Sequence, residues 1–252
     1  MNKKTKMWIG IIIAVILLLG GFYLYFYYPE TIPGLASVDS ELKENVNVLV
    51  IGMDDMENVD KGKIQADSIM LIELEPNNEI INFNSLSSNK IYDEKMIKNY
   101  SYDNLQKIVS EISNKEIDYY FKISYNGFIN IVDQLDGIDI ELKEKMNIPD
   151  LNLSLQKGLN HLNGKETLNY ARWYNYQNEQ DRLKRHIIVA EALVDKALKK
   201  ETVLNIPKIF STIIETYKNI ETNIDIKFIR RVLNFIQKRE NIVFNYDIID
   251  FK

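Results

Sequence analysis

The sequence predicts an α/β or α+β sandwich that follows a single N-terminal transmembrane helix. From residue 45 onward, short runs rich in β-branched residues alternate with longer stretches of helical periodicity, as in proteins that pack helices on a sheet. Before that point, residues 7–28 form an uncharged run. The chain has 252 residues and no cysteine. The roughly 220 residues beyond the run suffice for one domain, with or without small appendages, that is stabilised without disulfides.

The uncharged run is predicted to be an uncleaved membrane anchor. About 22 residues at ~1.5 Å each reach ~33 Å, enough to cross the hydrocarbon core of a bilayer. A cleaved signal peptide is the alternative, but the run exceeds the usual apolar length and no small-x-small cleavage site follows it. Lysines precede the run, so the N-terminus should be cytoplasmic and the main domain extracellular. We expect a tail at 1–6, the anchor at 7–28, a linker at 29–44 and the outer domain at 45–252.

The charge of the outer part argues against nucleic-acid binding. Three lysines are the only charged residues before residue 29, so the remainder carries 36 acidic residues against 28 basic ones, a net charge of −8. Nonspecific binding to nucleic acid relies on basic surface. We therefore expect the membrane as a partner and no nucleic acid.

The first half of the outer domain is predicted to contain three strands. Residues 46–52, VNVLVIG, are rich in β-branched residues and end at a glycine, as a buried strand does. Residues 68–74 form a second strand. A turn at 76–78 leads into a third strand at 79–84, which is expected to form a hairpin with the second.

Helices and strands alternate in the middle of the domain. Residues 102–113 and 126–135 carry apolar side chains at helical spacing. A strand at 119–123 lies between these two helices. Residues 138–142 alternate between apolar and acidic side chains, which predicts a strand with one solvated face.

The last part of the domain is predicted to be largely helical. A short helix begins near Gly164 and runs to residue 173, and residues 181–199 form a long amphipathic helix. Two further helices, near 205–217 and 225–238, precede a final strand near 241–246.

Two aspartates flank the first two predicted strands. Asp54 follows the strand at 46–52, and Asp67 directly precedes the strand at 68–74. If these strands are neighbours, both carboxylates lie at one edge of the sheet. They would suit Mg²⁺ there, because this ion binds one or two carboxylates together with substrate phosphates. The alternative is that both are turn residues, a common role of aspartate.

Three arginines converge around one loop of this acidic chain. A guanidinium group offers a planar set of donors that suits phosphate oxygens, so Arg172, Arg182 and Arg185 predict a phosphate-bearing ligand. Arg172 has apolar neighbours in sequence, and we expect it to be the most specifically held of the three. The alternative is that Arg182 and Arg185 belong to a solvated helix face, with Glu179 or Asp181 as a partner. Exposed pairs of that kind contribute only ~0–1 kcal/mol.

The two histidines do not predict a metal site. His161 lies in a polar turn predicted at 160–164 and is expected at the surface, whereas His186 directly follows Arg185 and could line the same site. No nucleophile-elbow, P-loop or HExxH motif occurs in the sequence.

Taken in order, these segments resemble the LytR-CpsA-Psr (LCP) family of envelope proteins over roughly residues 45–200. The resemblance rests on a set of motifs whose order and spacing agree with the family. They are NVLVIGMD at 47–54, ADSIML at 66–71, IDYYFKI at 117–123 with the GF at 127–128 and GIDI at 137–140, GLNHLNGK at 158–165, YAR at 170–172 and RLKRH at 182–186.

The resemblance implies an α-β-α sandwich with a mixed sheet. It also implies transfer of a glycopolymer from a polyprenyl-diphosphate carrier to peptidoglycan, in the cell membrane of a Gram-positive-type envelope. Mg²⁺ would be held by residues matching Asp54 and Asp67, and the diphosphate by Arg172, Arg182 and Arg185. An apolar pocket between sheet and helices would take the lipid tail. Asp67 and Arg172 are the implied catalytic residues, because charge on the diphosphate must be neutralised while a sugar hydroxyl attacks phosphorus.

Several family positions differ here, which keeps a second hypothesis open. Four arginines and one aspartate of the family pattern are replaced, and each lost charge-assisted hydrogen bond is worth ~1.5–3 kcal/mol. The alternative to a transferase is therefore a catalytically inactive relative that binds a polyprenyl-phosphate lipid or an envelope partner. Lys63 and Lys90 are candidates to replace the missing cations. The replaced positions are Met56, Gln65, Ser88, Asn89 and Tyr174, and the family's final glutamine is His186.

Overall fold

The computed structural model describes residues 41–54, 66–173, 179–197, 220–224, 228, 231–232, 235 and 241–250. The predicted anchor at 7–28 lies outside these residues. So do the helix predicted near 205–217 and most of the helix predicted near 225–238. Among the described residues, no helix is long and apolar enough to cross a membrane.

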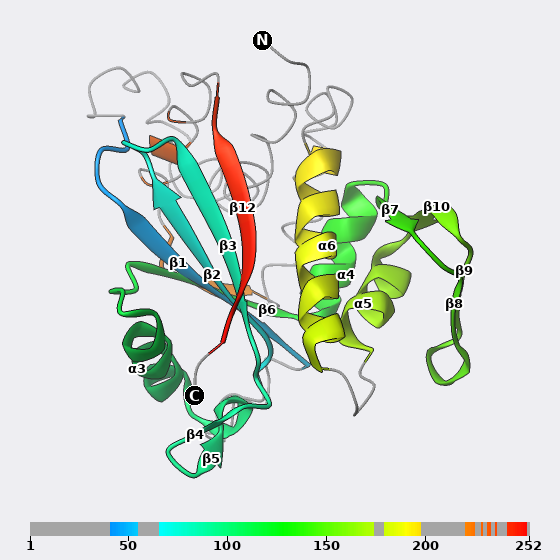
Figure 1. The fold of residues 1–252 in the computed structure, drawn as a ribbon, viewed down its shortest axis with the longest axis horizontal. Helices are drawn as coiled ribbons and strands as arrows, with labels where there is room; N and C mark the ends of the chain where they lie inside the picture. Colours follow the sequence, from blue (N-terminus) through cyan, green and yellow to red (C-terminus); the bar gives the residue numbers. More distant parts are fainter. Residues whose placement is uncertain are drawn as a thin grey trace, which may run out of the picture.

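A mixed six-stranded sheet forms the centre of the fold, with the strand order β11-β6-β1-β2-β3-β12 (Figure 1). β1 pairs in parallel with β6 and antiparallel with β2. β2 and β3 form the predicted hairpin. β12 joins β3 in parallel, and β11 pairs antiparallel with β6 at the other edge. The strands are β1 (Val46–Met53), β2 (Ala66–Glu75), β3 (Ile80–Leu86), β6 (Tyr119–Ser124), β11 (Ile220–Thr222) and β12 (Val243–Ile249).

Helices lie on both sides of this sheet, which confirms the predicted sandwich of a mixed sheet flanked by helices (Figure 1). α3 covers one face, where Leu105 and Val109 pack with Leu49 and Ile51 of β1. α4, α5 and α6 lie on the other side. β1 is therefore buried from both sides, which explains its nearly continuous apolar sequence. The helices are α3 (Tyr102–Ser113), α4 (Tyr125–Gln134), α5 (Gly164–Arg172) and α6 (Glu179–Ala197).

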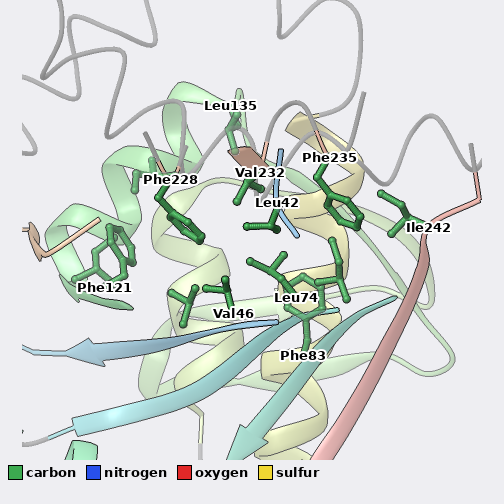
Figure 2. Close-up of a cluster of buried hydrophobic side chains, with 14 residues drawn as sticks. Leu42, Val46, Leu74, Phe83, Phe121, Leu135, Phe228, Val232, Phe235 and Ile242 are labelled. Atoms are coloured by element: carbon green, nitrogen blue, oxygen red, sulfur yellow. The ribbon is translucent and has the colours of Figure 1, made fainter. Parts of the chain in front are cut away.

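The core on the second face draws residues from distant parts of the chain (Figure 2). Phe228 is fully buried there, and its ring stacks on Tyr119 with ring centroids 4.0 Å apart. Leu42 is buried in the same cluster, ahead of the predicted domain start at residue 45. Leu42, in the segment predicted to be a linker, therefore contributes to the core.

An antiparallel ribbon extends beyond α5 (Figure 1). Its strand β7 (Ile138–Leu142) alternates as predicted, with Ile138 and Ile140 buried. The turn predicted at 160–164 is wrong, because β10 (Gly158–Leu162) pairs with β7 up to Leu162. His161 lies at the surface as expected. The remaining short elements are β4 (Ile91–Tyr92), β5 (Lys95–Met96), η3 (Ile97–Asn99), β8 (Met146–Ile148), η4 (Pro149–Leu151) and β9 (Leu153–Leu155).

Candidate functional site

A cavity of about 270 Å³ lies between the sheet and the second layer of helices. Its polar lining residues come from the sheet edge where β1 and β6 end and β2 begins, and from α4, α5 and the first turns of α6, whereas its apolar ones come from the strands and from α4, α5 and α6. The apolar residues are Val50, Met70, Ile123, Phe128, Leu168, Ala171, Val189, Ala190 and Leu193, and the polar side chains are Asp67, Ser68, Ser124, Tyr125, Arg172, Arg182 and His186.

Strand pairing brings the two predicted carboxylates to one edge of the sheet. β1 and β2 are neighbours, with Met53 opposite Ala66, so Asp54 and Asp67 occupy the same end of the pair. Asp54 is exposed and Asp67 is partly buried. The adjacency on which the predicted cation site depended is therefore present.

Tyr125 is at the same edge and was not among the predicted site residues. β1 and β6 are parallel, with Met53 opposite Ser124, so Tyr125 follows its strand where Asp54 follows its own. Its hydroxyl donates a hydrogen bond to Oδ2 of Asp67. Burial, followed by this bond and the charge of Asp67, raises the pKa of Tyr125 well above its ordinary value. The phenol is therefore protonated and acts as the donor.

Arg172 lies over the ring of Tyr125, with its guanidinium carbon 4.7 Å from the ring centroid. Its side chain is exposed. Within the described residues, its guanidinium group makes no hydrogen bond and no ion pair. The expectation that Arg172 would be the most specifically held of the three arginines is therefore wrong. It is an exposed residue in the lining of the cavity.

Arg182 is buried and is bound by protein groups on several sides. Its Nε and Nη2 donate to the two carboxylate oxygens of Glu179 at 3.0 and 2.5 Å. Nη1 donates to the backbone oxygen of Asp67 at 2.6 Å, and Nη2 also donates to Oγ of Ser88 at 3.2 Å. The predicted alternative of a pair with Glu179 is thus correct, but the pair is buried and not on a solvated face.

Glu179 is the centre of a wider polar network. Ser87 donates to its Oε1 at 2.6 Å, and the Asn89 amide donates to both carboxylate oxygens at 3.4–3.5 Å. Burial opposes ionisation, but the bonds from Arg182 and Ser87 prevail and hold the pKa of Glu179 below its ordinary value. A carboxylate from α6 therefore lies beside Asn89, where the family pattern has an aspartate.

Arg185 is held by the protein in a different way. Its Nε donates to the backbone oxygen of Tyr170 at 2.9 Å, and Nη2 donates to the backbone oxygen of Trp173. Its guanidinium carbon lies 5.0 Å from the centroid of the Trp173 ring. Burial lowers the pKa of Arg185. Arg185 is not among the residues that line the cavity, so its contacts tie α6 to the end of α5.

His186 lines the cavity from α6. Its Nδ1 lies 3.4 Å from Oγ of Ser68. Burial, reinforced by the charges of Arg182 and Arg185, lowers the pKa of His186 to about 3. The imidazole is therefore neutral at physiological pH.

One of the candidate replacement cations lies within the described residues. Lys90 is paired with Asp250, and Lys63 lies outside the described residues. Lys98, which was not predicted, donates from its Nζ to Oδ1 of Asn89 at 2.9 Å. A cation from η3 thus reaches the polar network around Glu179.

The donor set fits a magnesium ion in its chemistry. Within the described ranges, no group of three or more His, Asp or Glu side chains could hold a metal. Mg²⁺ needs no such cage, because it commonly binds one or two carboxylates and takes its other ligands from water and substrate phosphates. Oδ1 of Asp67 accepts no hydrogen bond from the described residues, and Asp54 is exposed beside it.

The missed residues carried a weak sequence signal. Tyr125 comes two residues after the strand predicted at 119–123, as Asp54 does after the strand predicted at 46–52, and parallel pairing of those strands places the two residues together. Glu179 is predicted only as a surface partner of Arg182, because nothing in the sequence shows that Arg182 is buried against β2 and the residues after β3.

The fold and the site together define an α-β-α protein whose apolar cavity ends in a charged cluster, an arrangement that suits an amphiphilic ligand with an anionic head group. The chain belongs to the LytR_cpsA_psr family, whose model matches residues 30–245. The predicted family is thereby confirmed.

Relatives and solved structures agree with this assignment. The chain is 26% identical over 256 residues to the polyisoprenyl-teichoic acid–peptidoglycan teichoic acid transferase TagU of Bacillus cereus, covering 89% of this chain and 80% of the relative. It is 28% identical over 194 residues to the regulatory protein MsrR of Staphylococcus aureus, covering 71% and 56%. The crystal structure of B. subtilis TagV has a TM-score of 0.66 at 22% identity, covering 84% of this chain and 86% of that one. TagT bound to LIIa-WTA has a TM-score of 0.63 at 19% identity, covering 85% and 81%.

Proposed function

We propose that this protein is a transferase that moves a glycopolymer from a polyprenyl-diphosphate carrier to peptidoglycan. The observation that carries the proposal is the cavity. It is apolar between the sheet and α6, and it has Asp67, Arg172 and Arg182 among its polar lining residues. A polyprenyl chain needs the first kind of surface and a diphosphate needs the second. The name of the relative TagU supports the same reaction class.

Each part of the site has a proposed role. The lipid tail lies in the cavity and its diphosphate lies beside Arg172, whose donors are available to phosphate oxygens. Asp54 and Asp67 would hold Mg²⁺, which supplies neutralisation of charge on the diphosphate when it is bound. A sugar hydroxyl of the wall loses its proton to water and forms a bond to the phosphorus that bears the glycan, as the phosphoanhydride bond breaks. Polyprenyl phosphate leaves, and Arg172 stabilises its developing charge.

The phosphate roles of Arg182 and Arg185 carry a condition. Both side chains spend donors on protein groups, and Arg182 is paired with Glu179. The Nε and Nη2 donors of Arg182 can therefore bind a diphosphate only if the ligand displaces Glu179. Arg185 is proposed to act indirectly, by holding the end of α5 that carries Arg172.

The same observation favours a second candidate function. With Arg182 and Arg185 engaged, Arg172 is the one arginine of the three whose donors are not used by the described residues. A protein of this kind could bind a polyprenyl-phosphate lipid without turning it over. We retain lipid binding without catalysis as the alternative.

The proposed setting follows the sequence. Residues 7–28 anchor the protein in the cell membrane, the N-terminus is cytoplasmic and the domain faces the wall of a Gram-positive-type envelope. The aromatic cluster at the outer end of the run and the lysines before it support this orientation.

Two measurements on the full-length protein test the function. Mass spectrometry of co-purifying lipid should find a polyprenyl phosphate or diphosphate. Mg²⁺-dependent release of polyprenyl phosphate from a lipid-linked glycan should be lost in Asp67→Ala and retained in Asp150→Ala, a matched change at an exposed residue of η4. Bound lipid without turnover would establish the alternative. Turnover that Asp67→Ala leaves unchanged would remove the cation site from the proposal.

A further inference from the structure

Tyr125 contacts two residues of the proposed site at the same time. We propose that it is a positioning residue that orders the Asp67 carboxylate for a cation and the Arg172 guanidinium for a phosphate. The proposal rests on the proposed function, because it assigns Tyr125 to the ligands of that site.

The hydroxyl of Tyr125 fixes one oxygen of Asp67. Oδ2 accepts the phenolic hydrogen bond, whereas Oδ1 accepts none from the described residues. A carboxylate held through one oxygen presents the other in a defined direction. Carboxylates that bind metal ions are commonly hydrogen-bonded in this way by a neighbouring group, and loss of that group lowers the affinity for the metal.

The ring of Tyr125 holds the Arg172 side chain without using its donors. The guanidinium group lies 4.7 Å from the ring centroid and makes no hydrogen bond or ion pair with the described residues. Stacking on a ring face leaves the planar edge of N–H groups open to phosphate oxygens. Arg182 and Arg185 are fixed in the opposite manner, by hydrogen bonds that consume donors.

Tyr125 is mounted on a rigid junction between a strand and a helix. It is the first residue of α4, and the buried Ser124 before it caps the helix by accepting from the Gly127 backbone at 3.1 Å. Ser124 is also opposite Met53 in the sheet. A side chain fixed at such a junction can hold its two partners in one geometry, which a loop residue would do poorly.

Two substitutions separate the two contacts. Tyr125→Phe removes the hydroxyl and keeps the ring under Arg172, whereas Tyr125→Met removes both. The full-length protein in detergent is titrated calorimetrically with Mg²⁺ and, separately, with farnesyl diphosphate in the presence of a chelator. We expect Tyr125→Phe to lower the affinity for Mg²⁺ about tenfold or more. Its affinity for farnesyl diphosphate without metal should stay within about twofold of that of the wild type. We expect Tyr125→Met to lower the affinity for both ligands. If Tyr125→Met does not fold, Tyr125→Leu takes its place.

Tyr102→Phe is the matched control. It removes a buried tyrosine hydroxyl that has no hydrogen-bond partner among the described residues, on α3 and away from the cavity. This variant should bind both ligands as the wild type does. Wild-type affinity for Mg²⁺ in Tyr125→Phe would overturn the role of the hydroxyl. Equal farnesyl diphosphate binding by the Phe and Met variants would overturn the role of the ring. A wild-type protein that binds neither ligand would overturn the proposed function itself, and this role of Tyr125 with it.

Discussion

The three arginines of the site differ in what their guanidinium groups contact. Arg182 and Arg185 are buried and donate to backbone oxygens, to Ser88 or to Glu179, whereas Arg172 is exposed over an aromatic ring. A buried arginine must have its donors satisfied, because unpaired burial of a charge is costly. The carboxylate of Glu179 thus competes with a phosphate for the same donors of Arg182.

Glu179→Gln should therefore increase the affinity for a diphosphate. Glutamine keeps the shape of the side chain and can still accept from Ser87, but it removes the negative charge from the Arg182 fork. One charge-assisted hydrogen bond is worth ~1.5–3 kcal/mol, so we expect farnesyl diphosphate to bind about tenfold tighter in calorimetric titration. Asp181→Asn removes the same charge from the exposed side of α6 and is the control. Weaker binding in Glu179→Gln than in this control would show that Glu179 supports the ligand.

His186 gives the protein a defined dependence of stability on pH. Its pKa is lowered from 6.5 to about 3 in the folded protein, mainly by burial and then by Arg182. Between pH 6.5 and about pH 3, His186 is therefore protonated in the unfolded chain and neutral in the folded chain. Stability from this residue is fully present above pH 6.5 and is lost as the pH falls through that window.

Urea unfolding at pH 7 and pH 5 tests this dependence. Between these values His186 should account for a loss of about 2 kcal/mol of unfolding free energy, and His186→Gln should remove that part of the loss. His161→Gln is the control, because His161 is half-exposed and lies 2.7 Å from Asp139. An equal loss in the wild type and in His186→Gln would contradict the prediction.

At the scale of single residues, the sequence predicts where some site residues lie but not which groups they contact. It predicts Asp54 and Asp67 at one edge because strand ends are legible in sequence, and this is borne out by pairing of β1 with β2. It predicts the wrong arginine as the most specifically held, because the apolar neighbours of Arg172 in sequence do not reveal that its side chain is exposed in the fold. Arg182 is the held one, since it is buried and pairs with Glu179, and the distant Ser87 and Ser88 bond to these two side chains.

At the scale of elements, close contact between α4 and α5 sets the position of Arg172. α5 begins at Gly164, whose backbone N–H donates to Asp133 of α4 at 2.6 Å. Asn163 caps the helix in a capping box with Glu166. A Cβ on Gly164 would lie 2.3 Å from the backbone oxygen of Ile129, a distance that no side chain can occupy. Glycine is therefore required for the two helices to approach this closely.

Gly164→Ala should force α5 away from α4. We expect a loss of about 1–3 kcal/mol of unfolding free energy, as for other overpacked sites, with weaker farnesyl diphosphate binding because Arg172 at the far end of α5 moves with the helix. Thermal unfolding followed by circular dichroism measures the first effect, and calorimetry the second. Lys165→Ala changes the next, exposed residue and should alter neither. A Gly164→Ala variant as stable as Lys165→Ala would show that α4 yields without cost.

Long periodic elements were predictable, and short ones were not. The residues of α3 and β7 agree with the predicted bounds, because each has several apolar side chains at the required period. β4 and β5 have two residues each, and β8 and β9 have three, which is too few to establish an alternation. The last three residues of β10 fall within the turn predicted at 160–164, because asparagine and glycine dominate that stretch locally. Its pairing with β7 is a tertiary interaction.

At the scale of the whole molecule, one helix connects the charged and apolar parts of the cavity. Arg182 and His186 line it from the first turns of α6, and Val189, Ala190 and Leu193 line it farther along. The strands of the sheet show the same gradient, from Asp67 and Ser68 at the edge to Met70 farther in. An amphipathic helix would usually turn its charged side to water, so burial of both kinds of residue on one face indicates a cavity for a ligand of mixed character.

Filling the apolar part should separate binding of the tail from binding of the head group. Ala190→Phe adds an aromatic ring to the apolar wall that α6 contributes to the cavity. We expect this variant to co-purify with no lipid and to bind farnesyl diphosphate with an affinity lowered about tenfold or more, because most of the buried apolar area belongs to the isoprenoid. Inorganic pyrophosphate should bind as it does to the wild type. Ile188→Phe enlarges a residue on the face of α6 turned to the β7–β10 ribbon and should affect neither ligand. If Ala190→Phe lowered the affinity for pyrophosphate as much as that for farnesyl diphosphate, the two parts of the cavity would act as one anion site. The assignment of the lipid tail to the apolar part would then be wrong.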